Sequence, residues 1–275
     1  MSHIFSRLLR IIWGAALIVI VSSCAKSPAA TPTLTPTTEP VILHLGISQA
    51  AGRAGEIIEN GFASAPGNIQ IHILTGSNQT LLEDLDRGLL DAVVVHRTEG
   101  YSQLWHTPIA MDGLVFVASP ENLFEEITVD EISSLFATGI NHKIDKLNED
   151  DVISIILPEP GSGILEIFKE RVMGGRSISG AARIVPDSRL IPEVVQSEGN
   201  ALGLTAMGVN DRNKALALEG ILPLPDTVLD QSYPLSIPLY FVSKSEPNGE
   251  LRRLLSWLHS DSGQSALGDF YGRLR

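Results

Sequence analysis

The sequence predicts an α/β fold, because strand-like and helix-like segments alternate along most of its length. Short apolar runs, typical of buried parallel strands, are each followed by a polar turn and then by apolar residues at helical spacing. Repeated strand–helix units of this kind build parallel sheets that are covered by helices. With 44% hydrophobic residues, the chain has enough apolar surface for a core in one or two domains.

The elements of the first half follow from this pattern. A mostly apolar strand is expected at residues 41–47, and a helix follows at 51–62, where apolar residues recur every three or four positions. Thr128 and Glu131 form a capping box that opens a helix, which is expected to end near Gly139. The other predicted elements of this half are strands at 69–74, 91–95 and 113–118 and a helix at 80–90.

The second half continues the alternation. Strands are predicted at residues 152–157, 201–207 and 235–243. Helices are predicted at residues 161–173, 190–198, 250–259 and 263–271.

The N-terminus has the features of a lipoprotein signal peptide, predicted at residues 1–23. Arg7 and Arg10 precede an uncharged apolar run at 11–21, which is too short to span a bilayer. A small-residue cleavage site then ends at Cys24 and resembles the bacterial lipobox. Because a thiol is the nucleophile that accepts a lipid, we expect Cys24 to be lipidated, with palmitate among its acyl chains. An ordinary signal peptide with an incidental cysteine and a retained membrane helix are the alternatives.

Residues 24–40 join this anchor to the folded part of the chain. After Cys24 they are rich in proline and threonine, so they bury little surface and are predicted to form an extended linker. Since Cys24 is the only cysteine, no disulfide can form within the chain. We therefore expect a protein held at the extracytoplasmic face of the cell membrane by its lipid.

Charge and motif content exclude several classes of function. With 20 basic and 32 acidic residues, the formal net charge is −12, which argues against a nucleic-acid partner. The seven histidines show no metal-ligand spacing, and neither a dinucleotide-binding nor a phosphate-loop motif occurs. Pro160 and Ile164 occupy the glycine positions of a nucleophile elbow around Ser162. We expect no enzyme activity, no cofactor and no metal.

Polar loops at the ends of predicted strands are the candidate binding site. Ligands of α/β proteins bind beyond the carboxyl ends of strands, where free N–H groups and hydroxyls at helix starts suit an oxyanion. Each serine there has a simpler interpretation as a helix N-cap, His96 as a core histidine, and Arg97 as half of a surface ion pair. The candidate ligand-binding residues are Ser48, Gln49, Gly76, Ser77, Asn78, His96, Arg97, Ser162 and Gly163.

Segments in the same order along the chain resemble the substrate-binding proteins of phosphate ABC transporters. The resemblance implies a periplasmic-binding-protein-like fold of type II, with two α/β lobes that are joined by a two-stranded hinge and close over an oxyanion. Lobe I would be residues 41–118 plus 239–275, and lobe II residues 119–238. The segments are Pro-Ile-Ala-Met-Asp-Gly-Leu-Val-Phe-Val at 108–117, Ile-Thr-Val-Asp-Glu-Ile at 127–132, Leu-Phe-Ala-Thr-Gly at 135–139, Glu-Pro-Gly-Ser-Gly at 159–163, Ala-Leu-Gly-Leu at 201–204, Tyr-Pro-Leu-Ser at 233–236, Pro-Leu-Tyr at 238–240 and Ser-Asp-Ser-Gly-Gln at 260–264.

This chain also departs from the family's pattern at its anion-binding segments. The Ser-Gly-Thr of the family is Ser-Gly-Ile at 162–164, and its Ser-Ser-Arg is Val-His-Arg at 95–97. The first loop offers Ser48-Gln49-Ala50-Ala51 in place of a Gly-Ser-Ser/Thr-Thr run. Each lost hydroxyl removes a hydrogen bond to a buried ion, so a ligand other than phosphate stays open.

The leading hypothesis is therefore a lipid-anchored, monomeric solute-binding component of an ABC importer. Its ligand would be phosphate or a similar oxyanion, and its protein partners would be the permease subunits. A receptor or scaffold lipoprotein that kept the fold but not transport is the alternative, and an exported hydrolase using Ser162 or a His/Asp pair is a third.

Overall fold

The computed structural model describes residues 40–62, 68–120, 125–139, 153–210 and 213–274, all of which belong to one compact unit, residues 38–275. The predicted signal peptide, Cys24 and the linker as far as residue 39 lie outside the described residues, as does residue 152, the first of a predicted strand.

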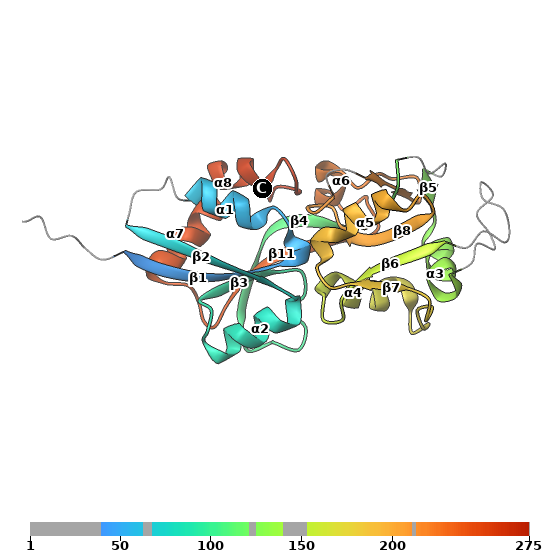
Figure 1. The fold of residues 1–275 in the computed structure, drawn as a ribbon. Helices are drawn as coiled ribbons and strands as arrows, with labels where there is room; N and C mark the ends of the chain where they lie inside the picture. The colour runs from blue at the N-terminus through green and yellow to red at the C-terminus, as the bar shows by residue number, and fades with distance from the viewer. Residues whose placement is uncertain (1–39, 63–67, 121–124, 140–152, 211–212, 275) are drawn as a thin grey trace, which may run out of the picture. The chain divides into compact units, whose positions relative to one another are not determined.

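A mixed sheet runs through the unit in the order β2-β1-β3-β11-β4-β8-β6-β7 (Figure 1). The strands on the first side are β1 (Val41–Ser48), β2 (Ile69–Gly76), β3 (Ala92–Val95), β4 (Trp105–Ala118) and β11 (Ser236–Ser243). Those on the second side are β6 (Ser154–Pro158), β7 (Arg183–Val185), β8 (Ala201–Ala206) and the short β9 (Lys214–Ala215), which pairs with β4. A separate small sheet joins β5 (Glu126–Ile127) and β10 (Ala217–Leu218).

Helices follow most of the strands, as the sequence predicts. The first side carries α1 (Ala54–Phe62), α2 (Asn78–Arg87), α7 (Gly249–Leu258) and α8 (Asp261–Leu267). The second side carries α3 (Val129–Thr138), α4 (Gly163–Phe168), α5 (Ile191–Ser197) and α6 (Pro225–Leu229). Two 3₁₀ turns, Gln49–Ala51 and Ser188–Leu190, precede α1 and α5, and a π-helical turn, Lys169–Met173, extends α4.

Two strands connect the two sides of the sheet, which confirms the two-lobed fold with a two-stranded hinge. The first part of β4 pairs with β11, and its last five residues, from Leu114, pair with β8. Both pairings are antiparallel, whereas β1, β2 and β3 are parallel to one another, and β6 is parallel to β7 and β8. The sheet is therefore mixed at the hinge, where the repeated strand–helix pattern predicted only parallel strands.

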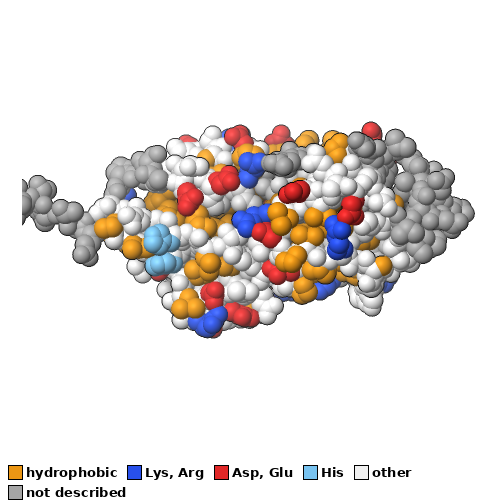
Figure 2. All heavy atoms as spheres, viewed as in Figure 1, with side chains coloured by type: hydrophobic (Ala, Val, Ile, Leu, Met, Phe, Trp, Pro, Cys, Tyr) orange, Lys and Arg blue, Asp and Glu red, His pale blue; other side chains and the backbone are white. Residues whose placement is uncertain are grey.

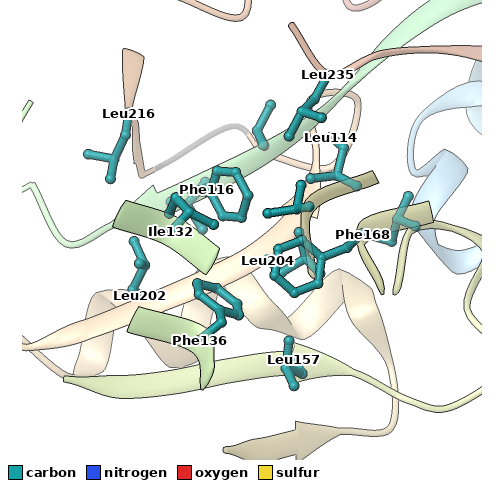
Figure 3. Packing of buried hydrophobic residues seen from close by; sticks show 14 of the residues in the cluster. Leu114, Phe116, Ile132, Phe136, Leu157, Phe168, Leu202, Leu204, Leu216 and Leu235 are labelled. Carbon is teal, nitrogen blue, oxygen red and sulfur yellow. The ribbon is translucent and has the colours of Figure 1, made fainter. Parts of the chain in front are cut away.

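Each lobe has its own hydrophobic core. In the second lobe, Phe116 of β4 packs on Phe136 of α3 and Phe168 of α4, with ring centroids 5.7 and 5.9 Å away (Figure 3). Aromatic pairs of this geometry add about 0.5–1.5 kcal/mol each beyond their buried area. In the first lobe, Leu45 and Ile58 are fully buried in a second cluster, between the sheet and the helices α1, α7 and α8.

The surface is mixed in character. On the face shown in Figure 2, acidic and basic side chains lie interspersed among hydrophobic ones. His44 and His72 lie side by side on β1 and β2, with their rings 5.5 Å apart. None of the helices within the described ranges is long and apolar enough to cross a membrane.

Candidate functional site

The predicted loops meet where the two lobes touch, a region called the interlobe cleft below. Gln79 N, in the first turn of α2, donates to Gly161 O across the cleft over 3.1 Å. The side chain of Gln49 also crosses it, since its Oε1 accepts from Ser188 N at 3.2 Å. The lobes of this structure are therefore in direct contact, which is the closed arrangement expected around a small ligand.

Ser48 and Ser77 act as helix N-caps, which was the simpler interpretation of each. Ser48 Oγ accepts from Ala51 N at 3.1 Å, and Ser77 Oγ accepts from Thr80 N at 3.1 Å. Ser77 Oγ also lies 2.9 Å from Thr80 Oγ1, which leaves Ser48 with the freer hydroxyl hydrogen. Gly76 ends β2 directly opposite Ser48 in the parallel register, so both loops start at the same edge of the sheet.

Ser162 differs from the other two serines. It precedes α4 and is only 5% exposed, yet its hydroxyl makes no capping bond to the helix. The loop before it turns at Gly161, where φ is +88° and a side chain would be strained. A buried hydroxyl at a helix start that is not used for capping is suited to a ligand.

Asn78 holds the end of β3 in place. Its Oδ1 accepts from His96 N at 3.2 Å and from Arg97 N at 3.1 Å, and its Nδ2 donates to Arg97 O at 2.9 Å. Gly163 lies against this amide from the other lobe, because a Cβ at Gly163 would be 2.5 Å from Asn78 Oδ1. The predicted residues of three loops thus converge on one point of the cleft.

Arg97 forms loose ion pairs rather than a tight salt bridge. Its Nε lies 3.4 Å from Glu99 Oε2, and one of its terminal nitrogens lies 3.6 Å from Glu170 Oε2 in the other lobe. The side chain is 29% exposed, and its Nε is buried without a hydrogen-bond partner. An anion in the cleft would compete with these two exposed carboxylates for the guanidinium.

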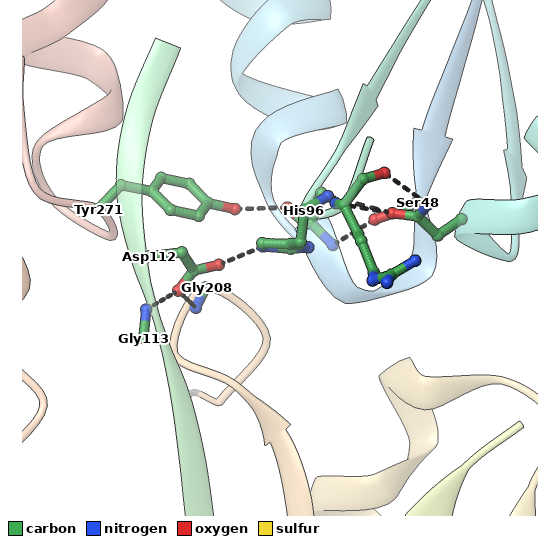
Figure 4. Close-up of polar contacts among 9 residues, drawn as sticks. Ser48, His96, Asp112, Gly113, Gly208 and Tyr271 are labelled. Atoms are coloured by element: carbon green, nitrogen blue, oxygen red, sulfur yellow. Dashed lines mark hydrogen bonds and ion pairs between the residues drawn. The ribbon is translucent and has the colours of Figure 1, made fainter. Parts of the chain in front are cut away.

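His96 makes a buried pair with Asp112 of β4 (Figure 4). The distance from His96 Nε2 to Asp112 Oδ2 is 2.9 Å, and both side chains are almost fully buried. Asp112 Oδ1 accepts from Gly113 N at 2.7 Å and, across the cleft, from Gly208 N at 3.2 Å. The carboxylate therefore ties His96, β4 and the second lobe together.

Tyr271 supports the same corner of the cleft from the C-terminal segment. Its hydroxyl donates to Ala51 O, and its ring packs on Gly208, where a Cβ would lie 2.4 Å from the ring. Complete burial, together with the nearby carboxylate of Asp112, raises the pKa of Tyr271 well above its ordinary value. The phenol therefore stays protonated and keeps donating its hydrogen bond at neutral pH.

Ser188 is a cleft residue that the sequence reasoning missed. It is 1% exposed, and its Oγ has no hydrogen-bond partner. The adjacent Asp187 binds Arg189 through both carboxylate oxygens, and hydrogen bonds from Arg189 lower the pKa of Asp187. The short β7 and the turn after it repeat the strand–polar loop–helix pattern of the other loops, and this pattern was the available signal.

Unsatisfied polar atoms gather in the cleft. In the described part of the chain, five buried side-chain atoms lack a hydrogen-bond partner, and three of them lie here. Buried polar groups in native proteins are nearly always hydrogen-bonded, so a group of exceptions indicates a place for a ligand. The three atoms are His96 Nδ1, Arg97 Nε and Ser188 Oγ.

Two cavities flank this part of the cleft. One, of about 410 Å³, is lined from both lobes by residues that include Ser48, Arg53 and Arg189. The other, of about 470 Å³, includes Arg97 and Gly163 in its lining. Both reach the range that small-molecule sites occupy in proteins.

Comparison with known proteins identifies the family. A family model described as a PBP superfamily domain matches residues 43–262. The chain belongs to the PBP superfamily. The match spans both lobes of this PBP-superfamily protein, from β1 to α8, and confirms the family that the sequence segments resemble.

The curated relatives and solved structures similar to this PBP-superfamily protein include phosphate-binding proteins. The phosphate-binding protein PstS 2 of Streptococcus pneumoniae is 30% identical to this chain over an alignment that covers 49% of this chain and 50% of that relative's length. The phosphate-binding protein PstS of Bacillus subtilis is 22% identical over 72% of this chain and 68% of its own. A structure described as a phosphate ABC transporter substrate-binding protein with bound phosphate, from Clostridium perfringens, has a TM-score of 0.78 at 22% identity, covering 85% of this chain and 100% of its own.

Proposed function

We propose that this protein is the solute-binding component of an ABC importer and holds a phosphate-like oxyanion in the interlobe cleft. The observation that carries the proposal is the convergence of strand-end loops from both lobes on a buried region with unsatisfied polar atoms. The PstS relatives are named for phosphate binding, which supports the same ligand class. The role is binding rather than catalysis.

Within the cleft, the ligand contacts are assigned to groups that keep donor capacity for an anion. Ser162 Oγ, Ser48 Oγ and the guanidinium of Arg97 are proposed to contact the anion. Asn78 and Gly163 are proposed to shape the loops around it, since the amide of Asn78 already makes three hydrogen bonds to the backbone. The side chains of Gln49 and Ser77 also accept hydrogen bonds from the backbone. For these two residues we propose a place beside the ligand, where they support the loops.

The N-terminus suggests how the protein is placed in the cell. We propose that residues 1–23 are removed as a signal peptide, that Cys24 carries the lipid, and that residues 25–40 link it to lobes at 41–118 plus 239–275 and 119–238. The protein then works as a lipid-anchored monomer at the extracytoplasmic face of the membrane, where it meets its permease. A metabolically incorporated palmitate label that is lost in Cys24→Ser would support the anchor, and a label retained in that variant would exclude it.

Ligand-induced stabilisation tests the binding function. The purified full chain, in mild detergent, is unfolded thermally with and without phosphate, sulfate, molybdate and tungstate. A ligand at 100 times its Kd adds about 2.7 kcal/mol to the free energy of unfolding, which raises the Tm of a protein this size by roughly 5–10 °C. A shift with phosphate supports the proposal, and no shift with any of these anions contradicts it.

A variant pair connects that binding to the cleft. Arg97→Ala should abolish the stabilisation by anion without unfolding the free protein, because the guanidinium lines a cleft cavity together with Gly163 and pairs only loosely. Arg252→Ala is the matched control, since this exposed arginine of α7 pairs with Glu246, outside the cleft. An Arg97→Ala variant that binds as tightly as the control would remove Arg97 from the site.

The second candidate function is a receptor or scaffold protein that has the same fold but takes no part in transport. It is favoured by the hydroxyl of Ser77, which already shares a hydrogen bond with Thr80 Oγ1 and leaves one donor fewer for a fully buried anion. Such a protein would show no anion-dependent stabilisation while keeping the same fold.

A further inference from the structure

We propose that the cleft takes a phosphate ester or phosphonate whose short carbon chain ends in an ammonium group, with that chain in the cavity beside Ser48. This inference rests on the proposed function, because the cavity adjoins the residues that are assigned to the anion. Its basis is a cavity of about 410 Å³ that both lobes line, together with the charges around it.

Ser48 connects this cavity to the anion. The serine ends β1, lines the cavity and is one of the three groups that are proposed to contact the ligand oxygens. Its Oγ accepts from Ala51 N, so its hydroxyl hydrogen can be donated to a ligand. Inorganic phosphate has no atoms beyond phosphorus and its oxygens, and it leaves a cavity of this size unfilled. A substituent on the phosphoryl group would extend past Ser48 into that space.

Part of the lining suits a short carbon chain. Ile47 of β1 and Ile73 of β2 line the cavity from the sheet, and Val209 lines it from the second lobe. Gly55 of α1 lines the cavity beside the two isoleucines, since a Cβ placed there would lie 3.5 Å from Ile73 and 3.7 Å from Ile47. Methylene groups against these residues would be removed from water, which favours binding.

Carboxylates outnumber cations in the lining. Glu56 and Glu59 are three residues apart on α1, so they lie on one side of that helix, and Glu193 comes from α5 in the other lobe. All three side chains are exposed, and no ion pair joins any of them to another described residue. They are therefore open to a cation that enters between the lobes.

The two arginines of the lining already have partners. Arg189 binds both carboxylate oxygens of Asp187, and the guanidinium of Arg53 lies 4.6 Å from the centre of the Phe270 ring. The cavity thus presents negative charge, whereas Arg97 presents positive charge to the proposed anion. A ligand with an anionic phosphoryl group at one end and an ammonium at the other is complementary to both.

A panel of four ligands tests the inference on the wild type, by calorimetric titration of the full chain in mild detergent. The ligands are inorganic phosphate, phosphoethanolamine, 2-aminoethylphosphonate and ethyl phosphate, the last of which lacks the ammonium group. We expect both aminated ligands to bind roughly fivefold or more tightly than ethyl phosphate, because each exposed carboxylate contributes modestly and three act together. This preference should shrink in about 0.5 M salt, which screens exposed charges.

A charge variant connects the preference to the three carboxylates. In the triple variant Glu56→Gln, Glu59→Gln and Glu193→Gln, phosphoethanolamine and ethyl phosphate should bind with nearly equal affinity. Glu126→Gln is the matched control, because Glu126 is an exposed glutamate of β5, at the far end of the second lobe (Figure 1). A triple variant that keeps the preference of the control would overturn the assignment of the ammonium to this cavity.

A steric variant tests whether the carbon chain occupies the cavity. Thr75 is exposed at the end of β2 and lines the cavity, so the ring of Thr75→Phe should fill part of it. Relative to inorganic phosphate, we expect this variant to bind phosphoethanolamine about tenfold or more weakly than the wild type does. Leu74→Phe is the control, because the exposed Leu74 points to the opposite face of the strand. Equal ratios for the two variants would place the chain elsewhere and overturn the inference.

The panel also separates this inference from the proposed function. Inorganic phosphate that binds while the three organic ligands do not would show that the cavity admits no substituent. Equal affinities of the wild type for phosphoethanolamine and ethyl phosphate would show that the carboxylates select no cation. Either result would overturn the inference and leave the proposed function standing, whereas a wild type that binds none of the four ligands would overturn both.

Discussion

Replacement of Asn78 by alanine should destabilise the protein and loosen the end of β3. The amide makes three hydrogen bonds to the backbone of residues 96 and 97, at distances between 2.9 and 3.2 Å. His96 N is buried and would be left unpaired, at a cost of about 1–3 kcal/mol, while the two partly accessible groups of Arg97 lose about 0.5–1 kcal/mol each. The total loss is about 2–5 kcal/mol.

Thermal unfolding of the full chain measures this loss. At roughly 2–4 °C per kcal/mol for a protein this size, the Tm should fall by roughly 4–20 °C. Asn78→Asp keeps the acceptor for both N–H groups and should lose less than Asn78→Ala. Asn248→Ala is the matched control, because Asn248 is an exposed N-cap whose side chain makes no capping bond. A Tm for Asn78→Ala within 2 °C of that control, a margin well below the expected loss, would refute the reasoning.

Three further predictions concern the closure of the cleft and the stability of the protein in acid and in alkali. Gly163→Ala puts a Cβ 2.5 Å from Asn78 Oδ1 and should weaken phosphate binding about tenfold or more in a titration, because the closed state is overpacked. Arg189 lowers the pKa of Asp187, so this carboxylate stabilises the folded protein above its unfolded pKa near 4 and ceases to do so as the pH falls. In acid denaturation, this loss of stability should be absent from Asp187→Asn. Burial raises the pKa of Tyr271, so its contribution to the free energy of unfolding is present below pH about 10 and is lost above it. This loss of stability in alkali should be absent from Tyr271→Phe.

A specific result would contradict each of these three predictions. Gly180→Ala is the control for closure, since no atom lies within 4 Å of a Cβ placed there, and equal affinities for the two glycine variants would show that the cleft tolerates the methyl group. An Asp187→Asn variant whose acid titration matches the wild type would remove that carboxylate from the acid response. A Tyr271→Phe variant with the same alkaline loss would place its origin elsewhere.

Local signals predicted most of the fold. The capping box of Thr128 and Glu131 opens α3 with both of its hydrogen bonds present, and Gly139 ends that helix with φ of +74°. Such motifs act within one turn of chain, so a sequence displays them directly. The uniformly buried β3 was equally plain, because a strand covered on both faces is apolar throughout.

The first half of β4 was not predicted, for a physical reason. Its residues 105–108 alternate between half-buried and exposed, and they include His106 and Pro108, which weaken the apolar pattern of a strand. Pairing with β11 stabilises this segment, and that partner lies more than 100 residues later in the chain. The sequence pattern therefore showed only residues 113–118, the part that enters the second lobe.

The site was predicted as a set of loops but not as a set of contacts. Local patterns placed Ser48, Ser77, Arg97 and Ser162 at strand ends, and the structure brings these ends together. The pair joins His96, just after β3, to Asp112 of β4, 16 positions later, and its bond appears only when the sheet forms. Whether a serine caps its own helix or keeps its hydroxyl free also depends on tertiary geometry, which separates Ser162 from the other two.

The most direct test of the central claim is a calorimetric titration of the full chain with inorganic phosphate. The account predicts saturable binding to a single site, which is lost in Arg97→Ala and kept in Arg252→Ala. Absence of heat and of any Tm shift with phosphate, sulfate, molybdate or tungstate would contradict an oxyanion-binding cleft.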